Sequence, residues 1–295
     1  MRRMSSSYTA VSAMMLKPSS INLGESHVMA ILNITPDSFY STSRHQTLTE
    51  IHSTITRATS EGATIIDIGG YSTRPGAEEV STEEEWQRIN LGLRALHETD
   101  ASVVASIDTF RSEIVRRAYE EYGAFIINDI SAGEADEAMI ETVAKCGLPY
   151  IAMHMRGTPT TMQSMTEYED GVVRGVVDYF SERTKELEAK GIRSENIILD
   201  PGFGFAKTAE QNHELLAGIA ELRALGYPLL IGVSRKSMIY RPLGITPEEA
   251  LPGSLALAWE ALRSGEAILR VHDVKETVQI LRLANYYKHV GYDKS

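Results

Sequence analysis

The sequence predicts an α/β fold, a single-domain (β/α)8 TIM barrel, and three observations support this prediction. Eight short apolar runs recur along the 295 residues, each gap between them holds a helix-like stretch, and another helix-like stretch follows the last run. Nearly continuous apolar runs are typical of strands buried on both faces, as in parallel sheets. Eight such units within about 265 residues match the barrel in number, size and order.

The expected strands are short apolar runs that lead into polar or glycine residues. They begin, in order, at Val28, Thr64, Val103, Phe125, Tyr150, Ile197, Leu229 and Ala267. The intervening helices include "TEEEWQRINLGLRALHE" (82–98) and "AEQNHELLAGIAELRAL" (209–225), and "VKETVQILRLANYYKHV" (274–290) follows the last strand. A doubly wound open sheet is the alternative. It often has a glycine-rich first turn, whereas the first turn here reads "NITPDSF" (33–39).

Local signals mark where these helices begin and end. Thr82 with Glu85, and Asp273 with Glu276, have the spacing of a capping box. Glycines lie where helices are expected to stop before the next strand, namely at Gly62, Gly147, Gly191, Gly226 and Gly265.

The chain divides into a short N-terminal segment and one domain. Residues 1–20 are rich in Ser and Met and contain no acidic residue, so a transit or signal peptide has to be considered. The apolar stretch "AVSAMML" (10–16) is short and no convincing cleavage site follows it. We therefore predict a flexible segment over residues 1–23 and a barrel domain over residues 24–295.

Composition excludes several classes of partner. The net charge of −11 argues against a broad nucleic-acid or anionic-membrane surface, because both need excess Lys and Arg. No apolar run approaches the roughly 20 residues that span a bilayer. Cys146 is the one cysteine, so no intrachain disulfide can form, which fits a reducing, cytoplasmic location.

Unusual polar residues follow the expected strands, where the chemistry of such barrels is found. Two of them, Asp129 and Asp273, have structural readings as a capping or supporting group and as a helix N-cap. His154 is out of phase with Met153 and Met155 in the strand alternation, which favours a structural role for it. The remaining strand-end candidates are Asn33, Thr73, Arg74, Asp108, Asn128, Asp200, Lys236, Ser237, Arg270 and His272.

These candidates divide into two chemistries. Cationic or ionisable groups at Arg74, Lys236, Arg270 and His272, with the neutral polar Thr73 and Asn33, could hold phosphates. Carboxylates and an amide can bind an amino-pyrimidine edge in a bidentate way, and such groups occur at Asp108, Asn128 and Asp200.

Seven motifs together resemble those of the dihydropteroate synthase family, in family order across residues 28–273. They are "MAILNITPDSF" (29–39), "DIGGYSTRPGA" (67–77), "SIDT" (106–109), "INDI" (127–130), "LDPGFGF" (199–205), "SRKS" (234–237) and "RVHD" (270–273). The resemblance implies an Mg²⁺-dependent transferase of folate biosynthesis. It would join p-aminobenzoate to 6-hydroxymethyl-7,8-dihydropterin diphosphate, giving 7,8-dihydropteroate and diphosphate. Sulfonamides act on this family by imitating p-aminobenzoate.

The resemblance also implies a role for each candidate. Asn33 would bind Mg²⁺, and Arg74 would belong to a mobile loop that closes over the diphosphate. Phe205 and Ser237 are similar to positions near the p-aminobenzoate pocket. The pterin substrate would be contacted by Thr73 (near its diphosphate), Asp108, Asn128, Asp200 and Lys236, and the diphosphate would be faced by Arg270 and His272.

The chain departs from the family pattern at two places. "STSRHQT" (41–47) replaces the usual acidic, glycine-rich loop, and Tyr71 replaces a more usual Glu. The alternatives are a pterin-binding methyltransferase barrel and a non-catalytic pterin-binding or scaffold protein. The resemblance suggests a homodimer, and "ALAWEALRSG" (256–265) and "ILRLANYYKHV" (280–290) carry apolar residues that could pack together.

Overall fold

The computed structural model describes residues 18–35, 44–71, 79–99, 102–158 and 161–291 of the 295-residue chain. Eight parallel strands form one sheet in the order β6-β5-β4-β3-β2-β1-β8-β7. The strands are β1 (His27–Asn33), β2 (Ile65–Gly69), β3 (Val104–Asp108), β4 (Ile126–Asp129), β5 (Tyr150–Met153), β6 (Ile197–Asp200), β7 (Leu230–Ile231) and β8 (Ile268–Val271). A parallel bridge between Leu199 and Leu229 joins the two edge strands, so the sheet closes into a barrel. The predicted fold class is confirmed.

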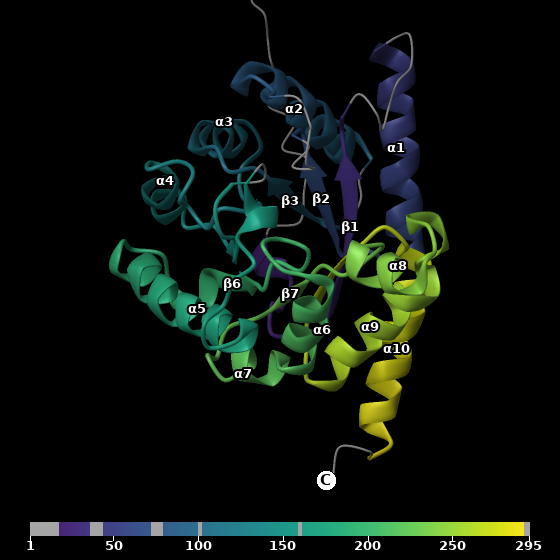
Figure 1. The fold of residues 1–295 in the computed structure, drawn as a ribbon. Helices are drawn as coiled ribbons and strands as arrows, with labels where there is room; N and C mark the ends of the chain where they lie inside the picture. The colour runs from purple at the N-terminus through teal and green to yellow at the C-terminus, as the bar shows by residue number, and fades with distance from the viewer. Residues whose placement is uncertain (1–17, 36–43, 72–78, 100–101, 159–160, 292–295) are drawn as a thin grey trace, which may run out of the picture.

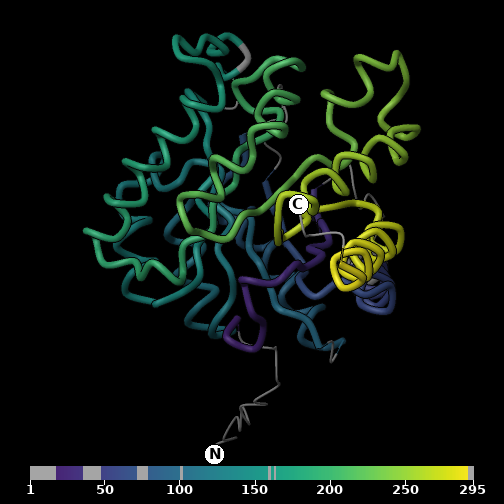
Figure 2. Tube along the Cα trace, turned by 90° about the horizontal axis from the view of Figure 1, so that it is seen from below, coloured from purple at the N-terminus to yellow at the C-terminus, as the bar shows by residue number. Residues whose placement is uncertain are grey.

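Helices surround this barrel, as a view from below shows (Figure 2). The last helix packs against the first, which completes the ring around the strands. In the described part of the chain the α-helices are α1 (Arg44–Glu61), α2 (Thr82–Glu98), α3 (Ser112–Tyr122), α4 (Met139–Cys146), α5 (Val172–Ala189), α6 (Ala209–Ala217), α7 (Ile219–Arg223), α8 (Ser237–Leu243), α9 (Leu251–Arg263) and α10 (Val274–His289) (Figure 1).

One predicted helix, over residues 209–225, is two helices in the structure. The break falls at Gly218, where an added Cβ would lie 2.7 Å from the Val173 side chain of α5. The close approach of α5 therefore requires the smallest residue at this point, which separates α6 from α7.

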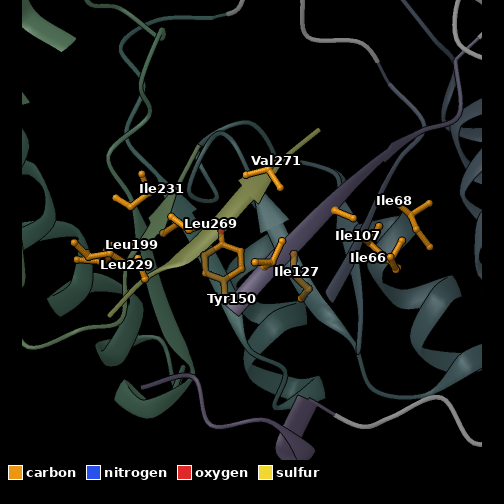
Figure 3. Packing of buried hydrophobic residues seen from close by; sticks show 14 of the residues in the cluster. Ile66, Ile68, Ile107, Ile127, Tyr150, Leu199, Leu229, Ile231, Leu269 and Val271 are labelled. Carbon is orange, nitrogen blue, oxygen red and sulfur yellow. The ribbon is translucent and has the colours of Figure 1, made fainter. Parts of the chain in front are cut away.

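The core has two layers because strand side chains alternate between the two faces of the sheet. The outward residues pack under the helices in one large cluster, part of which Figure 3 shows. The inward cluster takes one residue from each strand and is fully buried. We call it the floor ring; it consists of Met29, Ile65, Val104, Ile126, Ile151, Ile198, Leu230 and Ile268.

The N-terminal part of the described chain lies below the floor ring. Pro18–Ser20 form a 3-10 helix, and Ile21 and Leu23 pack against the ring. The barrel domain thus begins before residue 24. The flexibility predicted for residues 1–17 falls on residues that the structure does not describe. A cavity of about 560 Å³ also lies at this end, and none of the predicted site residues lines it.

Two predicted helix caps are wrong. Ser81, one residue before Thr82, caps α2 by accepting a hydrogen bond from the backbone N–H of Glu84. Glu85 is instead fully buried, accepts from Thr109 at 2.6 Å and pairs with Arg111 at 2.6 Å. A carboxylate at capping-box spacing is therefore used to tie α2 to the chain that follows β3.

The second wrong cap is at the start of α10. Asp273 occupies the N-cap position but its side chain makes no capping hydrogen bond. Its two carboxylate oxygens accept from Arg235 at 2.6 and 2.9 Å. This pair fixes the segment before α8 to the end of β8, where the candidate site lies.

Candidate active site

Most of the polar strand residues share the inward face with the floor ring. Side chains two residues apart point to the same side of a strand, so the positions two residues after the ring also face inward. Five of them are polar, namely Asp67, Ser106, Asn128, Asp200 and Arg270. One further step towards the strand ends lie Asn33, Asp108 and His272.

Asp67 joins several of these side chains into one network. It is fully buried and accepts hydrogen bonds from Ser106 at 2.6 Å, from the amide of Asn128 at 3.0 Å and from Arg270 Nε at 2.6 Å. The Nη2 of Arg270 reaches on to Asp108 at 2.8 Å. Arg270 therefore bridges two carboxylates, and Asp67 fixes how both Arg270 and Asn128 are oriented.

The sequence analysis missed Asp67, although a signal was present. The residue interrupts the apolar run "IIDIGG" with a charge, and it stands two positions before Gly69 on the inward face. A charge inside a strand buried on both faces needs a partner. Period-two alternation, applied to β2 as it applies to Asp108 on the neighbouring strand β3, would have placed it among the candidates.

Burial sets the electrostatics of this network. Burial raises the pKa of Asp108 to about 7, although the Arg270 guanidinium opposes the shift. Burial alone would lower the pKa of Arg270, but Asp67 and Asp108 outweigh it and the pKa is raised above its ordinary value. Arg270 is therefore a permanent cation, and Asp108 gains or loses a proton easily near neutral pH.

Asp200 and Lys236 form the other half of the arrangement. Asp200 accepts a hydrogen bond from the backbone N–H of Gly202 at 2.8 Å, and burial raises its pKa against the opposing effect of Lys236. Lys236 donates to the carbonyl of Phe203, and its Nζ lies 5.0 Å from the centre of the Phe205 ring. Burial lowers the pKa of Lys236 to about 8, although Asp200 favours its charged form.

The segment 234–237 lies beside the end of β8. Ser234 Oγ is 3.1 Å from His272 Nδ1 and also accepts from the His272 backbone N–H at 3.2 Å. Arg235 has φ of 54° and donates its backbone N–H to Ser254. Ser237 is the first residue of α8 and is partly buried. We refer to six of the inward residues together with Lys236 as the strand-end site; its members are Asn33, Asp67, Asp108, Asn128, Asp200, Lys236 and Arg270.

Several predicted residues stand apart from this site. Thr73 and Arg74 lie outside the residues that the structure describes. Asp129 and His154 are out of phase with the inward positions and are buried. Asp129 holds Ser131 and other neighbours by hydrogen bonds, which agrees with the supporting role predicted for it.

Asn33 offers a donor that suits a hard cation. Its side-chain Oδ1 and the Asp108 Oδ2 both lie over Gly69, at 3.0 and 3.8 Å from where a Cβ of that glycine would stand. The described residues contain no group of three or more His, Cys, Asp or Glu side chains arranged to hold a metal ion. Mg²⁺ is commonly held by one or two protein oxygens together with substrate phosphates and water, so the donors present fit Mg²⁺ that arrives with a phosphorylated substrate.

Comparison with known proteins shows the family of this chain. Residues 29–272 match the model of the pterin binding enzyme family. The chain is 46% identical over 264 residues to the dihydropteroate synthase of Escherichia coli strain K12, covering 90% of this chain and 92% of that one. The chain therefore belongs to the pterin-binding enzyme family. Within the family, this relative is a dihydropteroate synthase.

Two solved structures show the same fold. A Xanthomonas albilineans dihydropteroate synthase with 4-aminobenzoic acid has a TM-score of 0.83 at 37% identity and covers 91% of this chain and 95% of its own. A Yersinia pestis dihydropteroate synthase with a sulfonamide drug has a TM-score of 0.82 at 39% identity, with coverages of 91% and 96%. The family and fold predicted from the sequence are confirmed, and the two alternative classes are not supported.

Among the described residues, no helix combines the length and apolarity needed to cross a membrane.

Proposed function

We propose that the strand-end site carries out the dihydropteroate synthase reaction. The chain joins p-aminobenzoate to 6-hydroxymethyl-7,8-dihydropterin diphosphate and releases diphosphate and 7,8-dihydropteroate. The observation that carries the assignment of the site is the inward network of Asp67, Asp108, Asn128 and Arg270, which lies directly above an apolar floor. A ring rich in N–H donors and an attached anion need carboxylates and cations in one place, and this network supplies both.

The pterin ring is held by the acidic and amide side chains. Asp108 and Asp200 accept hydrogen bonds from the amino-pyrimidine edge, and Asn128, oriented by Asp67, supplies a donor and an acceptor. Lys236 fixes the polar edge of the ring, because its ammonium group lies near Asp200 and the Phe205 ring. Binding the ring at the barrel floor presents its CH₂–O bond towards the mouth of the barrel.

The reaction breaks the C–O bond to diphosphate and forms a C–N bond to the aromatic amine, which then loses a proton. Because the pterin ring can share positive charge with the reacting carbon, the carboxylates of Asp108 and Asp200 favour the cation-like transition state. Arg270 and His272 face the departing diphosphate, together with Thr73 and Arg74 of the loop outside the described residues. The amine is a neutral nucleophile and needs orientation rather than a strong base.

Release of diphosphate tests this proposal directly. The purified chain should release diphosphate only when both the pterin diphosphate and p-aminobenzoate are present, and 7,8-dihydropteroate should appear in equal amount. A methyltransferase or a non-catalytic pterin-binding protein would bind the pterin and release none. Absence of diphosphate from a folded, pterin-binding preparation would therefore contradict the proposal.

Mg²⁺ is proposed as the cofactor, held by Asn33 with the substrate phosphates. When bound, it would neutralise charge that develops on the leaving diphosphate. A single neutral protein ligand makes a poor preformed site. The chain's own contribution is then to place Asn33 Oδ1 above Gly69, near Asp108, which also accepts from Arg270.

Metal binding should accordingly depend on the anion. Calorimetric titration of Mg²⁺ into the free protein should give weak binding, whereas titration in the presence of diphosphate should tighten it about 10-fold or more. Asn33→Ala should lose most of this gain, since the gain requires the protein ligand. Asn90→Ala, which alters an amide on α2 that accepts from Tyr122, is the control and should leave metal binding unchanged. Tight Mg²⁺ binding to the free protein that survives Asn33→Ala would contradict the assignment.

Phe205 and Ser237 are proposed to border the p-aminobenzoate pocket. Both are partly buried, and Phe205 lies against Lys236 while Ser237 follows it in the chain. The Phe205 ring beside the Lys236 ammonium group, and the Ser237 hydroxyl at the start of α8, suit an aromatic acid. The Xanthomonas and Yersinia relatives were solved with 4-aminobenzoic acid and a sulfonamide, and sensitivity of this chain to sulfonamides is proposed on the same grounds.

A homodimer is proposed because α10 presents an apolar strip to solvent. Leu283, Tyr286 and Val290 are 52%, 65% and 58% exposed. These residues follow helical spacing along one side of α10, and Trp259 of α9 stacks edge-on against Tyr287 nearby. Large exposed apolar residues gathered on one face commonly mark a protein interface. A cytoplasmic location is proposed from the single cysteine.

The dimer proposal predicts a monomeric variant. Placing charge in the strip with Leu283→Glu and Tyr286→Glu should halve the mass measured by light scattering, because burying two unpaired carboxylates opposes association. The control is Lys145→Glu, which changes the charge on α4. The side chain of Lys145 is 73% exposed, and this substitution should leave the mass unchanged. An unaltered dimer mass in the doubly substituted protein would place the interface elsewhere, and a monomeric parent protein would end the proposal.

A further inference from the structure

The loop over residues 201–206 follows β6 and has an unusual backbone. Gly202, Gly204 and Ala206 all have left-handed φ, of 68°, 84° and 50°. At Gly202 an added Cβ would lie 2.0 Å from the backbone oxygen of His154, so only glycine fits there. Alternating left-handed residues prevent regular hydrogen bonding. Within the loop the N–H of Phe205 donates to the carbonyl of Gly202 at 3.0 Å, and the remaining polar backbone groups need partners elsewhere.

Side chains supply these partners. The N–H of Gly204 donates to Asn212 at 2.7 Å, and the carbonyl of Ala206 accepts from the hydroxyl of Tyr168 at 3.0 Å. The carbonyl of Phe203 accepts from Lys236, which belongs to the strand-end site. Side chains outside the loop thus fix its conformation. The Phe203 carbonyl in turn positions Lys236, which is proposed to bind the substrate.

Lys207 provides the remaining support, and its side chain is only 5% exposed. Its Nζ donates to the carbonyls of Gly202 at 3.0 Å and Phe205 at 2.9 Å, and lies 3.0 Å from His154 Nδ1. Three acceptors match the three N–H groups of an ammonium ion. Lys207 therefore ties both ends of the loop to each other and to the chain after β5.

The groups held by this loop are those proposed to bind the pterin. The N–H of Gly202 fixes the carboxylate of Asp200, and the Phe205 ring lies beside the Lys236 ammonium. Charge acts in the same direction, because Lys207 is among the cations that favour ionised Asp200, after Lys236 and Arg270. Burial lowers the pKa of Lys207 to about 7, an effect that Asp200 opposes and Lys236 reinforces.

We propose that Lys207 is a positioning residue for this reaction. By gathering the carbonyls of Gly202 and Phe205 on one ammonium group, it fixes the loop that orients Asp200 and Lys236 together. Lys207 itself does not reach the substrate, since its Nζ is enclosed by loop carbonyls and His154. The proposal rests on the strand-end site described above, and its test compares variants of an enzyme whose activity has first been established.

Lys207→Met keeps the volume of the side chain and removes its donors and charge. We expect kcat/KM for the pterin diphosphate to fall at least 30-fold, with most of the loss in KM, because Asp200 and Lys236 would no longer be held together. The matched control is Thr208→Ala, which removes the N-cap of α6 one residue away. It should lower the melting temperature while changing kcat/KM less than threefold.

The pH profile separates positioning from packing. The charged groups around Asp200 are Lys236, Arg270 and Lys207, and each of them lowers the pKa of Asp200. Loss of the Lys207 charge should therefore raise the pKa of Asp200 and move the acid limb of the kcat/KM profile to higher pH. Thr208→Ala should leave this limb in place. An acid limb that does not move in Lys207→Met, or a loss of kcat/KM no larger than in the control, would overturn the proposal.

A second variant covers the case in which Lys207→Met does not fold. Lys207→Gln can still donate to one loop carbonyl but carries no charge. It should show the same shift of the acid limb with a smaller loss of kcat/KM. Activity and a pH profile like those of the parent enzyme in folded Lys207→Gln would overturn the proposal equally.

Discussion

Replacing Asp200 by alanine is expected to abolish detectable pterin binding while the barrel stays folded. Asp200 is inward, 7% exposed and close to Lys236. Truncating one member of a buried charge pair costs roughly 2–5 kcal/mol of binding, or about 30- to 5,000-fold in affinity. Calorimetric titration with a pterin ligand should therefore give no measurable heat of specific binding, and kcat/KM should fall in parallel.

The effect of the Asp200 substitution on stability should depend on pH. Burial raises the pKa of Asp200, so its contribution to folding is present at low pH and is lost as the pH rises through the folded-state pKa. The loss of melting temperature in Asp200→Ala should therefore be smaller at high pH than at low pH, when each variant is compared with the parent protein at the same pH.

A buried carboxylate on the other face provides the control for Asp200. Asp129 lies at the end of β4 but holds Ser131, Gly133 and Tyr150 by hydrogen bonds outside the barrel. Asp129→Ala should lower the melting temperature and retain pterin binding. Normal pterin binding by Asp200→Ala, or loss of binding by both variants alike, would contradict the assignment of Asp200 to the pterin site.

The fold could be predicted because its strands are buried on both faces. Such strands are continuous apolar runs, and every strand of the structure begins within one residue of the predicted start. The break of the predicted helix at Gly218 could not be foreseen in the same way. It depends on how closely α5 approaches, which is a contact between segments distant in the sequence.

The site was predictable where strand geometry alone determines it. Asp108, Asn128, Asp200 and Arg270 stand at inward strand positions, and alternation along the strand is enough to place them. Asp67 was missed because it lies within an apolar run rather than at its end, although the same alternation applies to it.

Residues in loops were harder to assign from the sequence. Lys207 follows "PGFGFA", and no periodic sequence pattern there distinguishes it from a surface lysine. It is nevertheless buried by the left-handed loop before it. Asp273 had a plausible local partner in the helix it precedes. Its actual partner, Arg235, lies 38 residues away and is brought near by the pairing of β7 with β8.

Arg270 is the residue whose loss should most damage the protein itself. Its side chain donates to Asp67 at 2.6 Å and to Asp108 at 2.8 Å, and Asp67 is completely buried. Without the guanidinium, two neighbouring carboxylates remain in a buried site, and no other cation of the described residues is bonded to them. Breaking a buried ion pair by removing one partner commonly costs about 3–5 kcal/mol.

Arg270→Leu should therefore lose about 3–5 kcal/mol of unfolding free energy at pH 8, as well as activity. The loss should shrink at pH 5, since protonation removes the uncompensated charge; the raised pKa of Asp108, about 7, already places one of these protonations in the accessible range. Denaturant unfolding of the variant and the parent at both pH values measures this difference.

Adding Asp67→Asn to Arg270→Leu should restore part of the stability at pH 8 but no activity, because the second substitution removes a buried negative charge without replacing the cation that faces the diphosphate. Equal destabilisation at both pH values, with no recovery in the double variant, would show that Arg270 stabilises the barrel through packing and that the paired carboxylates are held by other groups.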